Sequence, residues 1–193
     1  MMIWRRMKPV RMRRVQDFIR FESILPDGQL EALRQVERPL MMGHHVLPPS
    51  LDGLTLEQLS RFWAVTCTAD LMIVTGEVLL GWSKRKVLRS PALPMIGLCN
   101  WVSAELTRIC ALWEQARLPR TSEEMQAGFD RLSFGVFGIA DWYARRMGMQ
   151  NHDEAFATPW PRIWQCLMND TEEAAYARRL NEIYTNKHKI RGH

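Results

Sequence analysis

The sequence predicts an all-α protein, an irregular bundle of about six to eight helices that follows a basic N-terminal arm. Three observations predict this class. Apolar residues recur at helical spacing over most of the chain. Helix-start signals, above all capping boxes, precede several of these stretches. The chain of 193 residues is 47% apolar and 24% charged, which allows a sizeable core and excludes global disorder.

The first fifty or so residues predict short elements and a loop. Apolar residues over 15–25 fit a short amphipathic helix, a turn signal stands at 26–28, and 30–36 predicts a second short helical piece. Residues 39–53 hold three prolines and two glycines. We therefore expect a loop there, with a short extended run at its centre.

The clearest local signal starts a helix near residue 55. Thr55 and Gln58 form a capping box, in which each side chain satisfies a backbone N–H of the other residue. Leu54 and Leu59 can form the hydrophobic staple that accompanies it. One face of the predicted helix is apolar and is formed by Leu56, Leu59, Phe62 and Trp63.

The middle of the chain predicts two more helices. Residues 71–81 read as a buried helix that ends near Gly81, with a strand as the alternative because Ile73 and Val74 are β-branched. Ser83 begins a polar link. A long helix is then expected over about 93–116, with Ser90 as its N-cap.

The C-terminal part repeats the same signals. Gly135 and Gly138 weaken helix propensity and favour close packing, and Gly148 is a candidate helix-ending glycine. Predicted helix starts lie at Thr121 with Glu124, at Asn151, at Thr158 before Pro159, and at Asp170, which we expect to cap a last helix through about residue 187.

Charge is uneven along the chain. The net charge is +5, and residues 1–20 hold seven basic side chains against Asp17. Such an arm is typical of a solvated or partner-docking segment, with nucleic-acid binding through Arg11, Arg13 and Arg14 as the alternative. The predicted organisation is an arm over 1–38, a loop over 39–53, a helical core domain over 54–187 and a basic tail over 188–193.

The cysteines and the apolar runs indicate a reducing compartment and no membrane span. The four cysteines, Cys67, Cys99, Cys110 and Cys166, match no CxxC or Cys/His finger spacing and stand among apolar neighbours. No secretory signal is recognisable. The most apolar stretch, 71–82, is shorter than the roughly twenty residues that a membrane-spanning helix needs.

Candidate catalytic patterns are weak. His44-His45 lacks nearby partners for a metal, and His152-Asp153-Glu154 suits a helix start better than a general base. Cys166 in an apolar helix is expected to be an inert thiol. The glycines around Val136 lack the lysine and the strand of a phosphate-binding loop. The sequence predicts no enzyme, no metal and no cofactor.

The aromatic and methionine content points to protein binding. Eight tryptophans and twelve methionines can fill a core or line a groove that accepts a partner helix. The residues predicted to contact a partner are Phe62, Trp63, Trp142, Trp160 and Trp164, and each can equally be a core residue.

The stretches LTLEQLSRFW, ADLMIVTGEVLLGW and SKRKVLRSPALPMIGLCNWVSAEL resemble phage tail assembly chaperones in their helix starts and apolar faces. The run FGVFGIADWYARRMGMQNHDEAFATPWPRIWQCLMND is similar to the continuation in larger members from Bacteroidales prophages. The likeness covers about 54–185 and leaves out the basic arm.

The resemblance implies a chaperone in the cytoplasm of a bacterial host. Its partner would be the tape-measure protein, a long apolar helical chain, which tail tube protein later takes over. Self-association is a further expectation. A structural virion or tail connector component, and a nucleic-acid-binding protein, are the alternatives.

Overall fold

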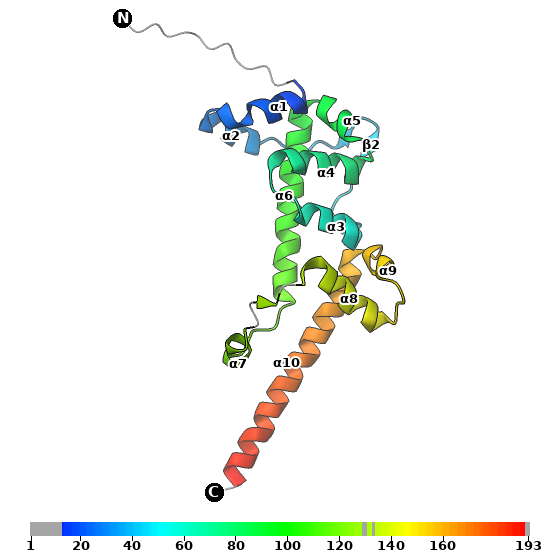
Figure 1. Ribbon diagram of the computed structural model, residues 1–193. Coiled ribbons are helices and arrows are strands. Elements are labelled where there is room, and N and C mark those ends of the chain that lie inside the picture. Colours follow the sequence, from blue (N-terminus) through cyan, green and yellow to red (C-terminus); the bar gives the residue numbers. More distant parts are fainter. Residues whose placement is uncertain (1–12, 129–130, 133, 192–193) are drawn as a thin grey trace, which may run out of the picture. The chain divides into compact units, whose positions relative to one another are not determined.

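The all-α class is confirmed. The computed structural model describes residues 13–128, 131–132 and 134–191 (Figure 1). These form ten α-helices, one 3-10 helix and one two-stranded sheet, more helices than expected because several are short. The helices are α1 Val15–Phe21, α2 Asp27–Arg34, α3 Leu56–Trp63, α4 Thr68–Leu80, α5 Lys84–Arg89, α6 Ala92–Gln115, α7 Ser122–Gln126, α8 Gly135–Met147, α9 His152–Phe156 and α10 Trp160–Arg191. The 3-10 helix is Glu22–Ile24, and the strands are β1 Met41–Met42 and β2 His45–Val46.

The residues group into two compact units. Among the described residues, unit 1 contains 13–49 and 61–106, and unit 2 contains 50–60 and 107–191. Residues 13–38, expected as a separate arm, are thus part of the first unit. The predicted loop at 39–53 holds the expected extended run, since Met41 and Met42 pair antiparallel with Val46 and His45.

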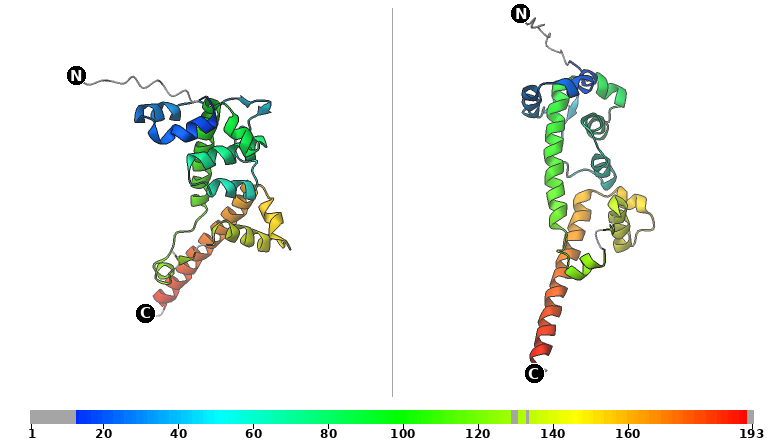
Figure 2. Two further views of the ribbon diagram at one scale, coloured as in Figure 1. Left: turned by 45° about the horizontal axis from the view of Figure 1, so that its top comes forward. Right: turned by 60° about the vertical axis from the view of Figure 1, so that its left-hand side comes forward.

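Unit 1 is built round the first half of α6, with α1, α2, α4 and α5 about it (Figure 2). The chain before α1 is held to the start of α6 by two backbone hydrogen bonds. The Val15 N–H donates to the Ser90 carbonyl at 3.0 Å, and the Ala92 N–H donates to the Arg13 carbonyl at 3.1 Å. The core of this unit is apolar and includes Val15, Phe18, Met72, Val87, Met95 and Leu98.

Two buried glycines allow close approaches inside unit 1. A Cβ on Gly76 of α4 would lie 2.2 Å from a methyl carbon of Val87 in α5. A Cβ on Gly97 of α6 would lie 2.1 Å from the carbonyl oxygen of Glu37. The second contact is with backbone, which cannot swing aside as a flexible side chain can.

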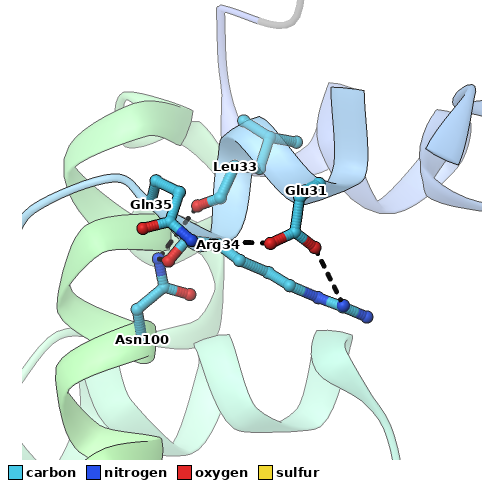
Figure 3. Close-up of polar contacts among 5 residues, drawn as sticks. All are labelled: Glu31, Leu33, Arg34, Gln35 and Asn100. Atoms are coloured by element: carbon cyan, nitrogen blue, oxygen red, sulfur yellow. Dashed lines mark hydrogen bonds and ion pairs between the residues drawn. The ribbon is translucent and has the colours of Figure 1, made fainter. Parts of the chain in front are cut away.

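A single amide side chain fixes the end of α2. The Asn100 amide nitrogen donates to the carbonyl oxygens of Leu33 and Arg34 at 2.9 and 3.2 Å (Figure 3). It also donates to the Val36 carbonyl at 3.2 Å. These carbonyls belong to the last turn of α2 and the residues after it, where carbonyls lack helical partners. Asn100 of α6 therefore acts as a C-terminal cap for another helix.

Unit 2 depends on Trp160, the first residue of α10. Its indole N–H donates to the Leu51 carbonyl at 2.9 Å, and its backbone N–H donates to the Leu54 carbonyl at 3.0 Å. The Leu56 N–H in turn donates to the Thr158 carbonyl at 2.9 Å. The loop before α3 is thereby joined to the start of α10.

The predicted helix start at Asp170 is wrong, because α10 runs unbroken from Trp160 to Arg191. No glycine or proline after Pro161 interrupts it. The Asp170 carboxylate instead accepts two hydrogen bonds from Nε of Arg146 in α8, at 3.0 and 3.1 Å. These bonds are the main reason that the pKa of Arg146 is raised.

Most other local signals are confirmed. Both capping boxes form, and Gly81 and Gly148 end their helices in the left-handed conformation. The alternative strand at Ile73 is excluded, since it lies within α4.

The polar link after Ser83 is a helix, α5, because the Ser83 hydroxyl accepts the Lys86 N–H and so acts as an N-cap. The expected N-cap role of Ser90 is wrong, since Ser90 is the C-cap of α5, its hydroxyl donates to the Val87 carbonyl, and α6 begins at Ala92.

We predict that Gly97→Ala lowers the free energy of unfolding by about 1–3 kcal/mol, because the new methyl group overlaps the Glu37 carbonyl. Urea denaturation monitored by circular dichroism measures this. Gly28→Ala is the control, since nothing lies within 4 Å of the added Cβ in α2. Equal stability of the two variants would contradict the predicted clash.

Trp160→Phe should lower the free energy of unfolding by about 2–3 kcal/mol, because it removes the indole hydrogen bond to the Leu51 carbonyl and opens a small cavity in the core of unit 2. The same change at Trp164, which donates to the Leu112 carbonyl at 2.9 Å but is only partly buried, should lower it by about 1 kcal/mol. Chemical denaturation of both variants gives the comparison, and a larger loss at Trp164 would argue against Trp160 as the anchor.

Candidate binding surfaces

The five side chains predicted to contact a partner differ in burial and belong to both units. Phe62 is 3% exposed and Trp160 is 2% exposed, so both serve their unit's core. Trp63, Trp142 and Trp164 are half-buried. Of these, Trp142 lines an open pocket on α8. A partner-contact role therefore stays a prediction for the three half-buried tryptophans.

The pocket on α8, here called the aromatic pocket, is formed by Phe134, Phe137, Gly138 and Trp142 with charged neighbours at its edge. Its volume is about 610 Å³. Phe134 is 72% exposed and Phe137 is 58% exposed. Large aromatic side chains that remain in solvent are typical of interaction surfaces when they cluster.

Local sequence explains how the two phenylalanines are presented. Gly135 has a φ of +54°, a left-handed conformation that suits glycine, directly after Phe134. A Cβ on Gly138 would lie 2.4 Å from the Phe134 Cβ, so only glycine lets Phe134 lie across this turn. The expected close packing of Gly138 is thus with a neighbouring side chain.

A ring contact and a polar contact connect the aromatic pocket to α9. The Phe137 ring stacks on the His152 ring of α9, with centroids 5.0 Å apart. His152 Nε2 lies 3.1 Å from an Asp141 carboxylate oxygen, and Arg145 pairs with the same carboxylate. Asp141 therefore pairs with basic side chains of α8 and α9, and Asp153, named with His152 as a candidate base, donates its backbone N–H to the Asn151 cap.

The second half of α10 presents an apolar stripe. Tyr176, Ile183 and Tyr184 are exposed, and Leu180 is half-buried. Their spacing of four, three and one residues places them along one side of an α-helix. We call this set the α10 stripe. Residues 181–187 are all exposed, so the stripe faces solvent at Ile183 and Tyr184.

The histidines, cysteines and carboxylates do not form a metal-binding cluster among the described residues. Among the residues that the structure describes, no three His, Cys, Asp or Glu side chains come together as metal ligands. His45 contacts Trp82 edge to face, with centroids 6.0 Å apart. Cys99 is buried, and burial raises the pKa of its thiol to about 12.

Two cysteines differ from the expected burial. Cys67 and Cys110 are exposed, whereas Cys166 is half-buried. Cys67 precedes α4 as its N-cap residue, outside the helical core, and Cys110 lies on an outward side of α6. An apolar sequence neighbourhood does not tell which side of a helix a residue takes.

Of the three arginines named for nucleic-acid binding, the structure describes two. Arg11 lies outside the described residues, whereas Arg13 and Arg14 are exposed. Their backbone joins the start of α6 in unit 1, so their positions are fixed from the main chain.

No protein-family model matches the sequence, and comparison with curated proteins and with solved structures finds no match. None of the described helices combines the length and apolar character needed to cross a membrane. The tail-chaperone resemblance therefore stands on the sequence patterns alone.

Phe134 and Phe137 were missed by the sequence analysis. The sequence around them predicts a weak helix with packing glycines, and it lacks the lysine and the strand of a phosphate-binding loop. The available signal was two phenylalanines beside two glycines, at a spacing that puts them on adjacent turns. That pattern does not distinguish an exposed pair from a buried one.

We predict that iodoacetamide at neutral pH modifies Cys67 and Cys110 rapidly, Cys166 more slowly and Cys99 only after unfolding. The thiolate is the reactive form, and Cys99 is both buried and has a pKa raised to about 12. Peptide mass spectrometry after timed alkylation measures the order. Early labelling of Cys99 in native protein would contradict it.

Proposed function

We propose that this chain is an assembly chaperone that binds an apolar helical polypeptide, and that its client is a phage tape-measure protein. The observation that supports protein binding best is the aromatic pocket, where Phe134 and Phe137 stand largely in solvent. The client's identity comes from the resemblance of the sequence to tail assembly chaperones.

The aromatic pocket has the chemistry that holds an apolar side chain. Burying one large aromatic side chain contributes about 1.5–3 kcal/mol, so two of them can supply much of a moderate affinity. Arg145 and Arg146 at the edge are paired with Asp141 and Asp170, which keeps their charges out of the apolar floor.

The α10 stripe suits a partner helix. Apolar residues at i, i+4, i+7 and i+8 are the pattern by which an amphipathic helix packs against another. The stripe extends over residues 176–184, about 12 Å along the helix axis, and so adds a contact line to the aromatic pocket. Several weak apolar contacts, each readily released, are what a chaperone displaced by tube subunits requires.

A test is co-expression of the chain with an apolar helical fragment of a tape-measure protein. The expected result is that the fragment is soluble only with this chain present and that the two purify together. A fragment that stays insoluble, or that is soluble alone, would remove the proposed client.

Single substitutions test whether the aromatic pocket and the α10 stripe contact the client. Phe134→Ser and Ile183→Asp should each weaken client binding about tenfold, because each removes an apolar contact of the size found at interface hot spots. Ile24→Asp is the matched control, since Ile24 is also exposed but belongs to unit 1. Fluorescence anisotropy with a labelled client peptide measures all three, and equal affinities would count against these surfaces.

The structural-component alternative has its own readout. A chaperone should be absent from finished particles, whereas a connector should be present in them. Mass spectrometry of purified particles separates the two. A second copy of the chain on the α10 stripe would instead appear as a dimer that Ile183→Asp dissociates, measured by analytical ultracentrifugation.

A further inference from the structure

Unit 1 contains a second open pocket, which we call the basic pocket. Its volume is about 920 Å³. Met41, Met42, Trp82 and Pro94 give it an apolar floor, and Arg85 and Arg89 of α5 stand on its wall. It goes beyond the proposed function, because the aromatic pocket and the α10 stripe both belong to unit 2.

The charge of the basic pocket is uncompensated. Arg85, Lys86 and Arg89 are exposed, and no carboxylate of a described residue lies within ion-pair distance of them. The described residues that line the pocket include no Asp or Glu. Lys86 Nζ instead lies 4.4 Å from the centroid of the Trp82 ring, as a cation–π contact.

Trp82 carries an unmet hydrogen bond. It is 8% exposed, and its indole nitrogen is buried without an acceptor among the described residues. A buried N–H without a partner is unfavourable by about 1–3 kcal/mol, and few such groups remain in folded proteins. Because that nitrogen is buried, Trp82 contributes its ring, and not its N–H, to the pocket.

We propose that the basic pocket binds an acidic, amphipathic segment of a partner polypeptide. An apolar side chain of the segment packs against Met41 and Pro94, and its flanking carboxylates pair with Arg85 and Arg89. Charge complementarity and the apolar floor together select this partner.

The pocket chemistry favours a polypeptide over a nucleic acid. Base recognition in single strands depends on open aromatic faces. Here Lys86 covers one face of Trp82, and His45 contacts the same ring edge to face. The methionines and the proline of the apolar floor fit aliphatic and aromatic side chains of a protein. Met41, Val46 and Leu93, in the hairpin and the first turn of α6, are also exposed.

The test is titration of the full chain with a short fluorescein-labelled peptide that carries leucine and phenylalanine among aspartates and glutamates. Binding should be saturable and should weaken as salt is raised. Arg85→Ala and Arg89→Ala should each raise Kd about two- to fivefold, the range expected for exposed ion pairs. Alanine favours helix at least as well as arginine, so α5 should stay folded.

Matched controls separate charge from apolar contact. Arg20→Ala removes the same charge in unit 1 from a residue that does not line the pocket, and it should leave Kd unchanged. Met41→Ser should raise Kd about threefold by removing apolar contact. A peptide with glutamine and asparagine in place of the acids should bind at least about tenfold more weakly.

Three results would overturn the assignment. One is no saturable binding of the acidic peptide by the folded protein. Another is equal Kd for the Arg85, Arg89 and Arg20 variants. The last is tighter binding of single-stranded DNA than of the peptide, with Met41→Ser without effect, which would make the pocket a phosphate site. Loss of client binding at Phe134 changes none of these readouts, so the two proposals fail independently.

Discussion

The buried indole of Trp160 is the contact on which unit 2 depends. Its N–H and the neighbouring backbone bonds tie the loop before α3 to the first turn of α10, across more than one hundred residues of sequence, since the indole bond joins positions 109 apart. Closing so long a loop is entropically unfavourable, so it requires several contacts in one place. Because the base of α10 is fixed there, Arg146 of α8 meets Asp170 two to three turns further along the helix.

Local signals gave most of the secondary structure, because they depend on near neighbours. The capping boxes at Thr55 and Thr121 and the glycines at 81 and 148 need only residues a few positions away. The helix start predicted at Asp170 was wrong for the same reason, because it was inferred from near neighbours alone. As a carboxylate before a polar stretch it resembles an N-cap, and only the position of Arg146 in space determines its role.

Burial of aromatic residues was the part that sequence could not determine. Trp160 and Phe62 are residue types common at protein interfaces, yet both are buried in the core. Phe134 and Phe137 are largely exposed to solvent. Which side of a short helix is covered depends on what packs against it, and in this chain those elements are far away in sequence. The sequence therefore predicted the type of surface, aromatic side chains that bind a partner, but not its residues. Of the five residues named, only Trp142 lines the aromatic pocket.

The cap that Asn100 provides has a consequence for motion. α2 contains no fully buried residue, and Leu30 and Leu33 are half-buried, so polar contacts supply much of its attachment, among them the bonds from one amide to three carbonyls. Helices held with little apolar burial open at low free energy while the core around them stays closed. Amide hydrogens of α2 should therefore exchange with solvent deuterium long before those of the buried first turns of α6. The earliest local unfolding in unit 1 would thus release the end of α2 without disrupting the core beneath it.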